Sequence, residues 1–310
     1  MKLKELSEGK VEIDLMISSL TSGVTNKGAK YLSLQVQDNT GSMDAKYWNL
    51  SPEESDRYKA GMVCHFKGDI IKYNNALQLR VVSMEVLNPK ELNVVEFVQS
   101  SSYTKKELME KIGNVIYSIK NPIYKDIVNS LVKKHEADFY VYPAASTIHH
   151  NFVGGLATHV LGMLELAEDM ASKYELLDRD LLVSGVILHD IGKISELSGP
   201  IATEYTLLGR LVGHISIMQG EVYEMSKELG YENSEEATLL RHMILSHHGE
   251  YEYGSPVKPM IPEAEILNYI DNIDARMNVM EKAFANVEKG CFTGKIFALE
   301  GRVMYKAKNK

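Results

Sequence analysis

The stretch DLLVSGVILHDIGK, residues 180–193, is an almost uninterrupted apolar segment that ends in a histidine and an aspartate. Its apolar residues recur at spacings of three and four up to Leu188, which predicts a helix. His189 and Asp190 then close this helix. Because adjacent helical residues point about 100° apart, both side chains reach one place most easily where the helix ends and Gly192 frees the chain. We therefore expect His189 and Asp190 to serve a single site.

The same helical period continues through most of the chain. From about Thr104 onward, apolar residues recur every three or four positions in several long segments. The longest of these segments are residues 156–174, 207–229, 234–248 and 262–284. The C-terminal part of the chain is therefore expected to be all-helical.

Five histidines and two aspartates lie on these predicted helices or at their ends, and most of them interrupt apolar stripes. They are His159, His189, Asp190, His214, His247, His248 and Asp271. Each alone has an ordinary alternative, a hydrogen-bonded core histidine or, for Asp271, an ion pair with Arg276. Together they exceed what one metal ion needs, and they suit two ions roughly 3.5–4 Å apart that share a carboxylate, an arrangement that serves phosphoryl displacement. The set predicts a phosphodiesterase or a nuclease.

The first 90 residues alternate between apolar and polar positions, which is typical of β-strands. A short capped helix is predicted at 51–61, with Ser51 as N-cap, Pro52 as the first helical residue and Glu54 completing a capping box. Strands are predicted at 11–20, at 30–49 on both sides of a turn at 38–41, at 62–73 and at 76–87. Three strands, a helix and two strands match an OB-fold, a partly open five-stranded barrel.

The sequence thus predicts a multidomain protein, in which a small all-β OB-fold barrel precedes a larger all-α helical bundle. We place the barrel at residues 1–90 and the helical domain at 104–310. A linker is expected at 91–103, within a segment that contains Asn88-Pro89 and three consecutive serines.

Charge and composition limit the partners and the compartment. The 310-residue chain has a net charge of −8, and no apolar stretch approaches the length of a membrane span or a signal sequence. Residues 1–90 hold 12 Lys/Arg and 11 Asp/Glu, a balance of +1, so the acidic excess lies in the remainder. A tight binder of duplex DNA, which needs a broad basic face, is excluded. A cytoplasmic protein with two incidental cysteines is expected.

The ligand-type residues carry a resemblance to a known family. His159, then HDIGK at 189–193, then Asp271 resembles the His…His-Asp…Asp pattern of HD-domain metal-dependent phosphohydrolases. His214 and the pair His247-His248 resemble the two-metal branch of that family. An OB-fold ahead of such a domain, with HHNFVGGLATH at 149–159, is similar to the YhaM-type 3′→5′ exoribonucleases, and the likeness runs over nearly the whole chain.

The resemblance implies a ligand set and a reaction. One ion would be held by His159, His189, Asp190 and Asp271, and a second by Asp190, His214, His247 and His248, with Asp190 bridging. Hydroxide attack at this two-metal centre would release nucleoside 5′-monophosphates from the 3′ end of single-stranded RNA, and DNA is kept open as a second substrate. Imidazole with carboxylate suits Mn²⁺, the expected ion, and also Fe²⁺ or Co²⁺.

Other side chains are candidates for contacts with the substrate. Lys193 would act with Asp190 in catalysis by offering charge to the phosphorane oxygens, and the alternative is a surface lysine at a helix end. His149, His150 and Arg241 are further candidates for phosphate contacts, with helix packing or a solvated ion pair as alternatives. In the barrel, substrate contacts are expected from Tyr31, Tyr47, Tyr73, Lys30, Lys46 and Lys72, whereas Trp48 is expected in the core.

Two other functions stay open. One is an HD-type phosphohydrolase of free or cyclic nucleotides, although such a substrate needs no strand-tracking barrel. The other is a nucleic-acid-binding regulator, although a scaffold has no need for seven buried ligand-type residues. A homo-oligomer is also left open.

Overall fold

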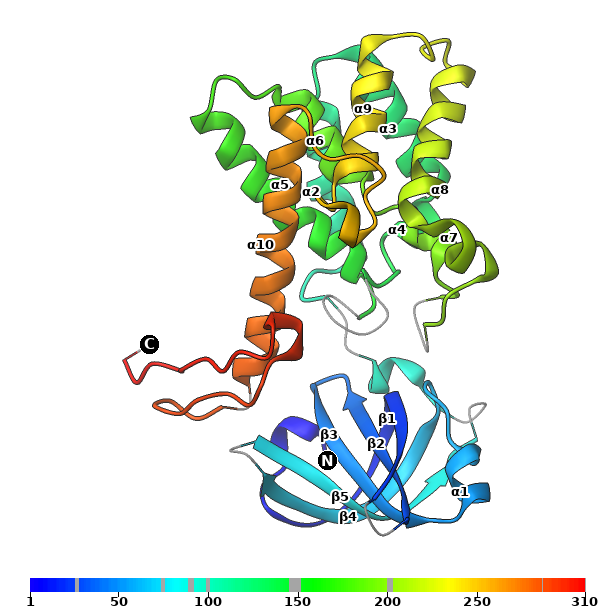
Figure 1. The fold of residues 1–310 in the computed structure, drawn as a ribbon, viewed down its shortest axis with the longest axis vertical. Coiled ribbons are helices and arrows are strands. Elements are labelled where there is room, and N and C mark those ends of the chain that lie inside the picture. The colour runs from blue at the N-terminus through cyan, green and yellow to red at the C-terminus, as the bar shows by residue number, and fades with distance from the viewer. Residues whose placement is uncertain are drawn as a thin grey trace. The chain divides into compact units, whose positions relative to one another are not determined.

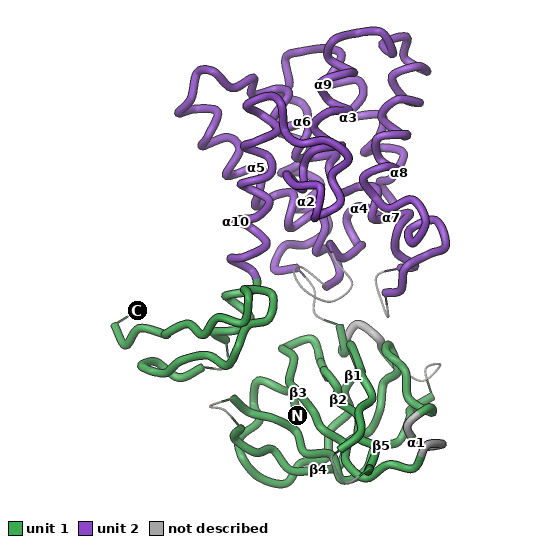
Figure 2. Tube along the Cα trace, viewed as in Figure 1, with its two compact units in different colours: residues 1–100, 279–310 green, residues 101–278 purple. Residues whose placement is uncertain are grey.

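The computed structural model divides the chain into two compact units (Figures 1 and 2). One unit comprises Met1–Ser100 together with Val279–Lys310, and the other comprises Ser101–Asn278. The sequence-based division, in contrast, assigns Val279–Lys310 to the helical domain. The structure describes residues 1–25, 28–73, 76–88, 92–98, 101–144, 152–199, 203–285 and 287–309.

A closed five-stranded barrel forms the core of the first unit. Its neighbours run in the order β1-β2-β3-β5-β4, with β3 and β5 parallel and the other pairs antiparallel. The elements are β1 (Gly9–Val24), β2 (Lys30–Asp38), β3 (Gly41–Leu50), α1 (Pro52–Arg57), β4 (Val63–Tyr73) and β5 (Ala76–Val86). The predicted OB-fold order is therefore confirmed.

Local chemistry sets the turns and the ends of these elements. Asp38 turns the chain between β2 and β3, because its Oδ1 atom accepts hydrogen bonds from the backbone N–H and the hydroxyl of Thr40 at 2.7 and 2.6 Å. Ser51 and Glu54 form the predicted capping box of α1, with backbone-to-side-chain distances of 3.1 Å in both directions.

Trp48 corrects one prediction about the barrel. It was expected in the core, but it is 42% exposed. The core is filled by the inward-facing aliphatic residues of the five strands, together with Phe66. The neighbouring Tyr47 packs against that core. Trp48 instead lies on the outside of β3, where its ring is beside that of Tyr31.

The remainder of the first unit is largely irregular. Two short 3₁₀ helices flank the barrel strands, and another lies near the C-terminus. They are η1 (Leu3–Glu5), η3 (Val94–Phe97) and η5 (Phe297–Leu299). Isolated bridges pair Phe292 with Tyr305 and Ile296 with Arg302. Within this unit, the Nζ atom of Lys72 on β4 lies 3.1 Å from Oε1 of Glu288.

Among the described residues, every named element of the second unit is a helix, as predicted, and one isolated bridge pairs Leu197 with Tyr205. Side-chain caps begin most of its longer helices, for example Thr104, Asn121 and Asp178. The helices are α2 (Lys105–Ser118), α3 (Pro122–Lys134), α4 (Glu136–Phe139), α5 (Gly155–Lys173), α6 (Arg179–Leu188), α7 (Lys193–Glu196), α8 (Leu207–Glu228), α9 (Glu235–Ser246), η4 (Tyr251–Tyr253) and α10 (Pro262–Ala285).

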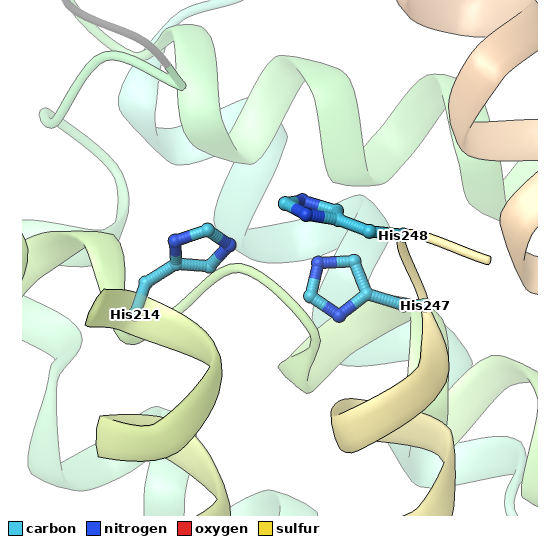
Figure 3. Close-up of side chains that lie close together, drawn as sticks. All are labelled: His214, His247 and His248. Atoms are coloured by element: carbon cyan, nitrogen blue, oxygen red, sulfur yellow. The ribbon is translucent and has the colours of Figure 1, made fainter. Parts of the chain in front are cut away.

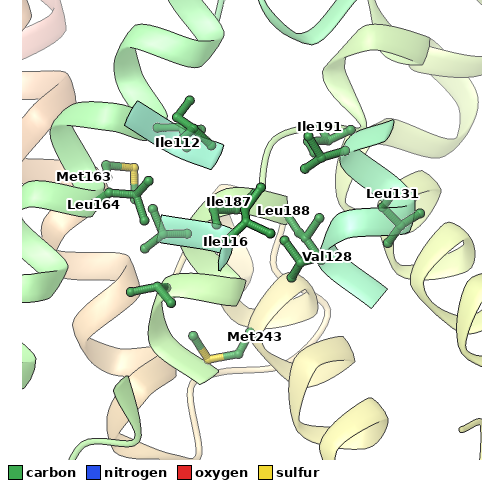
Figure 4. Packing of buried hydrophobic residues seen from close by; sticks show 14 of the residues in the cluster. Ile112, Ile116, Val128, Leu131, Met163, Leu164, Ile187, Leu188, Ile191 and Met243 are labelled. Carbon is green, nitrogen blue, oxygen red and sulfur yellow. The ribbon is translucent and has the colours of Figure 1, made fainter. Parts of the chain in front are cut away.

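Helix α6 runs through the core of this unit. Every residue from Leu181 to Leu188 is buried, because the segment is apolar on all sides, and α6 packs against α3, α5 and α9. Figure 4 shows this packing around Ile187 and Leu188. Because α6 ends inside the protein, His189 and Asp190, which follow it, are both buried.

Candidate metal centre

The seven ligand-type side chains predicted from the sequence come together at one place in the helical unit. His159 lies on α5, His189 and Asp190 follow α6, His214 lies on α8, His247 and His248 follow α9, and Asp271 lies on α10. His159, His189 and His247 are fully buried, and Asp190 is 2% exposed. Five helices that are far apart in the sequence thus converge on one buried polar cluster.

Two groups within this cluster have the spacing that a metal ion requires. His159, His189 and Asp271 present one ligand atom each, and these atoms all lie within 4.8 Å of one another. The same holds for His214, His247 and His248, whose rings turn toward one another from α8 and from the end of α9 (Figure 3). Each group could hold one ion.

Asp190 lies between the two groups and presents one carboxylate oxygen to each. Its Oδ2 atom is 3.3 Å from Nε2 of His189 and 3.9 Å from Nε2 of His159. Its Oδ1 atom is 3.5 Å from Nε2 of His214 and 3.8 Å from Nε2 of His247. This is the placement that a carboxylate shared by two ions requires.

All five histidines direct Nε2 toward the cluster because a neighbour occupies Nδ1. The Nδ1 contacts are His159 with Oδ2 of Asp274 at 2.6 Å, His189 with the carbonyl oxygen of Val186 at 2.8 Å, His214 with Oε1 of Glu196 at 3.1 Å, His247 with the carbonyl oxygen of Ile244 at 2.8 Å, and His248 with the carbonyl oxygen of Tyr253 at 2.7 Å. A carbonyl or carboxylate at Nδ1 makes that nitrogen the N–H donor and leaves the Nε2 lone pair for a metal.

Several buried polar atoms of the cluster make no hydrogen bond within the part of the chain that the structure describes. They are Nε2 of His189, His214 and His247 and Oδ1 of Asp190. Leaving one buried polar atom unsatisfied costs about 1–3 kcal/mol, and such atoms are rare in folded proteins. Four of them in one place are therefore best explained by an ion that binds them. Imidazole nitrogens and carboxylate oxygens are also the donors that Mn²⁺, Fe²⁺ and Co²⁺ accept. The residues present therefore fit divalent metal ions.

The charges of the cluster favour a cation. Burial opposes the ionised form of Asp190, but Lys193, His189 and His214 outweigh it and hold the pKa of this carboxyl well below its usual range. Burial and the nearby His248 lower the pKa of His247 well below its usual range, which keeps this imidazole neutral. At His159, burial acts against protonation, yet Asp271 and Asp274 raise the pKa to about 10. The carboxylates of Asp271 and Asp274 thus favour positive charge at His159.

Lys193 contacts the carboxylate at the centre of the cluster. Its Nζ atom lies 2.6 Å from Oδ2 of Asp190, and its side chain is only 12% exposed. The alternative of a surface lysine at a helix end is therefore wrong. Burial alone would lower the pKa of Lys193, but Asp190 raises it, so the ammonium group stays charged.

Gly192 serves the site for a reason other than the predicted one. Its φ of −55° is ordinary helical backbone, so the glycine does not free the chain. A side chain at this position would instead overlap the backbone carbonyl of His214, so the glycine lets α8 approach the end of α6. The unusual backbone lies at Gly213, where φ of 75° and ψ of 152° kink α8 directly before His214.

Of the other candidates in the helical unit, Arg241 lies within the described residues and the two histidines before α5 do not. Arg241 lies over the ring of Tyr223 on α8, 4.9 Å from its centroid. His149 and His150 lie outside the described residues.

The predicted substrate contacts on the barrel differ in their exposure and in their neighbours. Tyr31 and Trp48 form an aromatic pair with centroids 4.8 Å apart, and Nζ of Lys46 lies 5.4 Å from the centroid of Tyr31. Tyr73 is 59% exposed, whereas Tyr47 packs against the barrel core. Lys72 is paired with Glu288, and Lys30 is half-buried at the start of β2.

Sequence reasoning missed two carboxylates that contact histidines of the cluster, Asp274 and Glu196. Asp274 lies three residues after Asp271 and therefore on the same face of α10, a spacing that could have indicated it. Glu196 closes the short helix α7 that begins at Lys193, and only the tertiary structure brings it to His214.

Two protein families match the chain, one over the barrel and one over the helical unit. Residues 156–276 match the HD domain family, and residues 12–87 match the OB-fold nucleic acid binding domain family. The chain is 45% identical to the 3′-5′ exoribonuclease YhaM of Geobacillus sp. (strain WCH70) over 297 residues, which cover 96% of this chain and 91% of that protein.

Some solved structures are similar to part of the chain. A domain of replication protein A from Methanococcus maripaludis is 21% identical, covering 28% of this chain and 94% of that domain with a TM-score of 0.25. The protein PriB from Ralstonia solanacearum is 13% identical, covering 26% and 100% with a TM-score of 0.24. Among the described residues, no helix has the length and apolar character needed to cross a membrane.

Proposed function

Because the chain belongs to the YhaM family of 3′-5′ exoribonucleases, we propose that it shortens single-stranded RNA from the 3′ end and releases nucleoside 5′-monophosphates at a two-metal centre. The 45% identity extends over both the barrel and the HD domain, so the pairing of a nucleic-acid-binding module with a phosphohydrolase module is shared.

One observation above all supports two ions rather than one, namely the position of Asp190. Its two oxygens face two separate groups, each with three ligand atoms within 4.8 Å of one another. His159, His189 and Asp271 would hold one ion, and His214, His247 and His248 the other, with Asp190 shared. A single-metal site would need neither the second histidine group nor a carboxylate between the two.

Divalent ions bound there would supply Lewis acidity and a nucleophilic water near neutral pH. The chain's own residues do the rest. Nδ1 contacts fix the five imidazoles so that no ligand has to reorient, and burial keeps bulk water away from Asp190. Lys193 holds a buried positive charge beside Asp190, where it can stabilise the charge that develops on the phosphoryl oxygens.

The barrel would bind the strand. Exposed aromatic rings suit base stacking, which is worth about 1–3 kcal/mol per base and requires no particular sequence. Tyr31 and Trp48 offer two adjacent rings, and the ammonium group of Lys46, which lies next to the ring of Tyr31, would contact a phosphate. Lys72 is less suited to that role, because Glu288 already neutralises it.

Mn²⁺ is the ion that we propose. The two groups and Asp190 together offer five imidazole nitrogens and two carboxylates, a set that Mn²⁺, Fe²⁺ and Co²⁺ accept and that Mg²⁺, which prefers oxygen ligands, does not.

The test is a denaturing gel of 5′-labelled single-stranded RNA with protein and Mn²⁺, with chromatography of the products. We expect a ladder that descends from the full length, nucleoside 5′-monophosphates as products, and loss of both with EDTA or with Asp190→Ala. Asp169→Ala, at an exposed position on α5, is the matched control and should keep full activity. A parallel lane with single-stranded DNA decides whether DNA is a substrate.

Intact RNA in the presence of two bound ions would refute the exonuclease. Hydrolysis of free or cyclic nucleotides by that same preparation would then assign the centre to a nucleotide phosphohydrolase. Cleavage that persists in Asp190→Ala would refute the role of the shared carboxylate.

A further inference from the structure

Two carboxylates outside the ligand set contact ligand histidines, one in each group. Oδ2 of Asp274 lies 2.6 Å from Nδ1 of His159, and Oε1 of Glu196 lies 3.1 Å from Nδ1 of His214. The Nδ1 atoms of the other three histidines contact backbone carbonyl oxygens. Each group therefore contains one histidine that is backed by a negative charge.

Close helix packing places Asp274. It lies on α10 one turn after the ligand Asp271, so both carboxylates face α5. On α5, Gly162 lies one turn after His159, and a Cβ atom there would lie 2.6 Å from Oδ1 of Asp274. The glycine thus leaves the space in which the Asp274 carboxylate reaches His159.

The kink in α8 explains how Glu196 contacts His214. Because Gly213 has non-helical backbone angles, the N–H group of His214 begins a new helical segment and needs an acceptor. Oε1 of Glu196 accepts from this backbone N–H at 3.1 Å and also contacts the imidazole. Glu196 is 8% exposed, so its charge is poorly screened.

A carboxylate at Nδ1 does more than a carbonyl oxygen does. Both fix the tautomer and the ring orientation, but only the carboxylate adds a negative charge that makes Nε2 a more basic ligand. Loss of such a partner typically weakens metal binding 10- to 100-fold. The two groups should therefore depend on two different residues.

We propose that Asp274 and Glu196 are positioning residues that set the metal affinities of the two groups separately. Asp274 controls the group of His159, His189 and Asp271, and Glu196 controls the group of His214, His247 and His248. The proposal rests on the two-metal centre of the proposed function, but it concerns residues that bind neither metal nor RNA.

The experiment is a Mn²⁺ titration of the full-length metal-free protein, in which free Mn²⁺ is counted by its electron paramagnetic resonance signal and bound Mn²⁺ by elemental analysis. Asp271→Ala and His248→Ala each remove a ligand of one group and so assign each dissociation constant to its group. We then expect Asp274→Ala to weaken only the first group and Glu196→Ala only the second, each by 10- to 100-fold, with the other constant unchanged.

Three further variants separate positioning from a general loss of structure. Asp274→Asn keeps an acceptor for His159 but removes the charge, so its effect should be smaller than that of Asp274→Ala. Gly162→Ala displaces the carboxylate without changing any charge and should also weaken only the first group. Glu221→Gln is the matched control, because Glu221 lies 2.6 Å from Nε2 of His135, outside the cluster, and its loss should leave both constants unchanged.

The proposal is overturned if the alanine variants at 274 and 196 leave both constants unchanged, or if each weakens both groups equally while thermal melting shows a folded protein. If the wild-type chain itself binds fewer than two Mn²⁺ ions, the two-metal centre fails and the proposal falls with it. The wild-type titration therefore distinguishes the two failures without any measurement of RNA cleavage.

Discussion

The ammonium group of Lys193 and the carboxylate of Asp190 form a buried ion pair with a distance of 2.6 Å, three residues apart where α6 gives way to α7. Asp190 thereby has a positive neighbour in the absence of metal, which lowers the cost of burying its charge. In the proposed reaction, the same ammonium group would stabilise the negative charge that develops on the phosphoryl oxygens.

The first prediction follows from this pair. Lys193→Met should lower kcat about 100- to 1,000-fold, the range found when one donor to a developing oxyanion is removed. Its Mn²⁺ stoichiometry should remain unchanged, because Lys193 is not a ligand. The measurement is steady-state RNA degradation together with elemental analysis, with Lys227→Met at an exposed position of α8 as control. Unchanged kcat in Lys193→Met would remove the lysine from the mechanism.

The second prediction concerns metal and stability. The ions would bind residues from five helices in the folded protein but not the unfolded chain. At a free Mn²⁺ concentration 100 times the dissociation constant, each bound ion should therefore stabilise the helical unit by about 2.7 kcal/mol. Mn²⁺ should therefore raise the melting temperature in differential scanning calorimetry, and EDTA should reverse the rise. In His247→Ala, Mn²⁺ should raise the melting temperature by less than in the wild type. A melting temperature that does not respond to Mn²⁺ would argue against a metal centre in this cluster.

The third prediction concerns Trp48, the single tryptophan of the chain. Because its ring is 42% exposed beside Tyr31, a stacked base should quench its fluorescence. Trp48→Ala should weaken binding of single-stranded RNA by about 1–3 kcal/mol, measured in EDTA by fluorescence anisotropy of labelled RNA. Tyr117→Phe, at an exposed position of α2 in the helical unit, is the control and should bind normally. RNA that binds without quenching would place the strand elsewhere.

The fourth prediction concerns pH and Glu221. Burial opposes ionisation of this carboxyl, but His135 and Lys134, at 2.6 and 2.9 Å, outweigh it and hold the pKa below its ordinary value of 4.5. A lowered folded pKa adds stability that is present above pH 4.5 and is lost as the pH falls through the folded pKa.

Glu221→Gln should therefore cost about 1.5–3 kcal/mol of unfolding free energy at pH 7, the range for hydrogen bonds to charged groups. The difference from wild type should shrink below pH 4.5. Urea unfolding at several pH values measures both effects. A difference that stays constant from pH 7 to pH 3 would show that the charge of Glu221 contributes nothing.

Much of the fold could be predicted because the signals are local. The capping box of Ser51 and Glu54 and the turn at Asp38 depend on residues within four positions, and both are present. The helix from 180 onward follows from its apolar period. The order of the predicted strands and helix indicated the OB-fold barrel, and the helical period from about Thr104 indicated the helical domain; the structure has both.

The errors concern residues whose surroundings come from distant parts of the chain. Trp48 follows the alternation of its strand, but the alternation does not say which face of the strand the barrel encloses at that point. Gly192 was read as a flexible position, whereas its role depends on the backbone of His214, more than twenty residues away. Asp274 had only its spacing from Asp271 to indicate it, and Glu196 reaches His214 only through the tertiary structure.

The sequence by itself determined the element types, the order of the OB-fold strands and the seven residues with metal-binding chemistry, because periodicity, capping and ligand type are properties of short segments. The tertiary structure decided that Asp190 lies between two groups, that Lys193 pairs with it, and that two further carboxylates back His159 and His214. Those relationships depend on how five helices pack, and packing is set by the shapes of all the contacting side chains together.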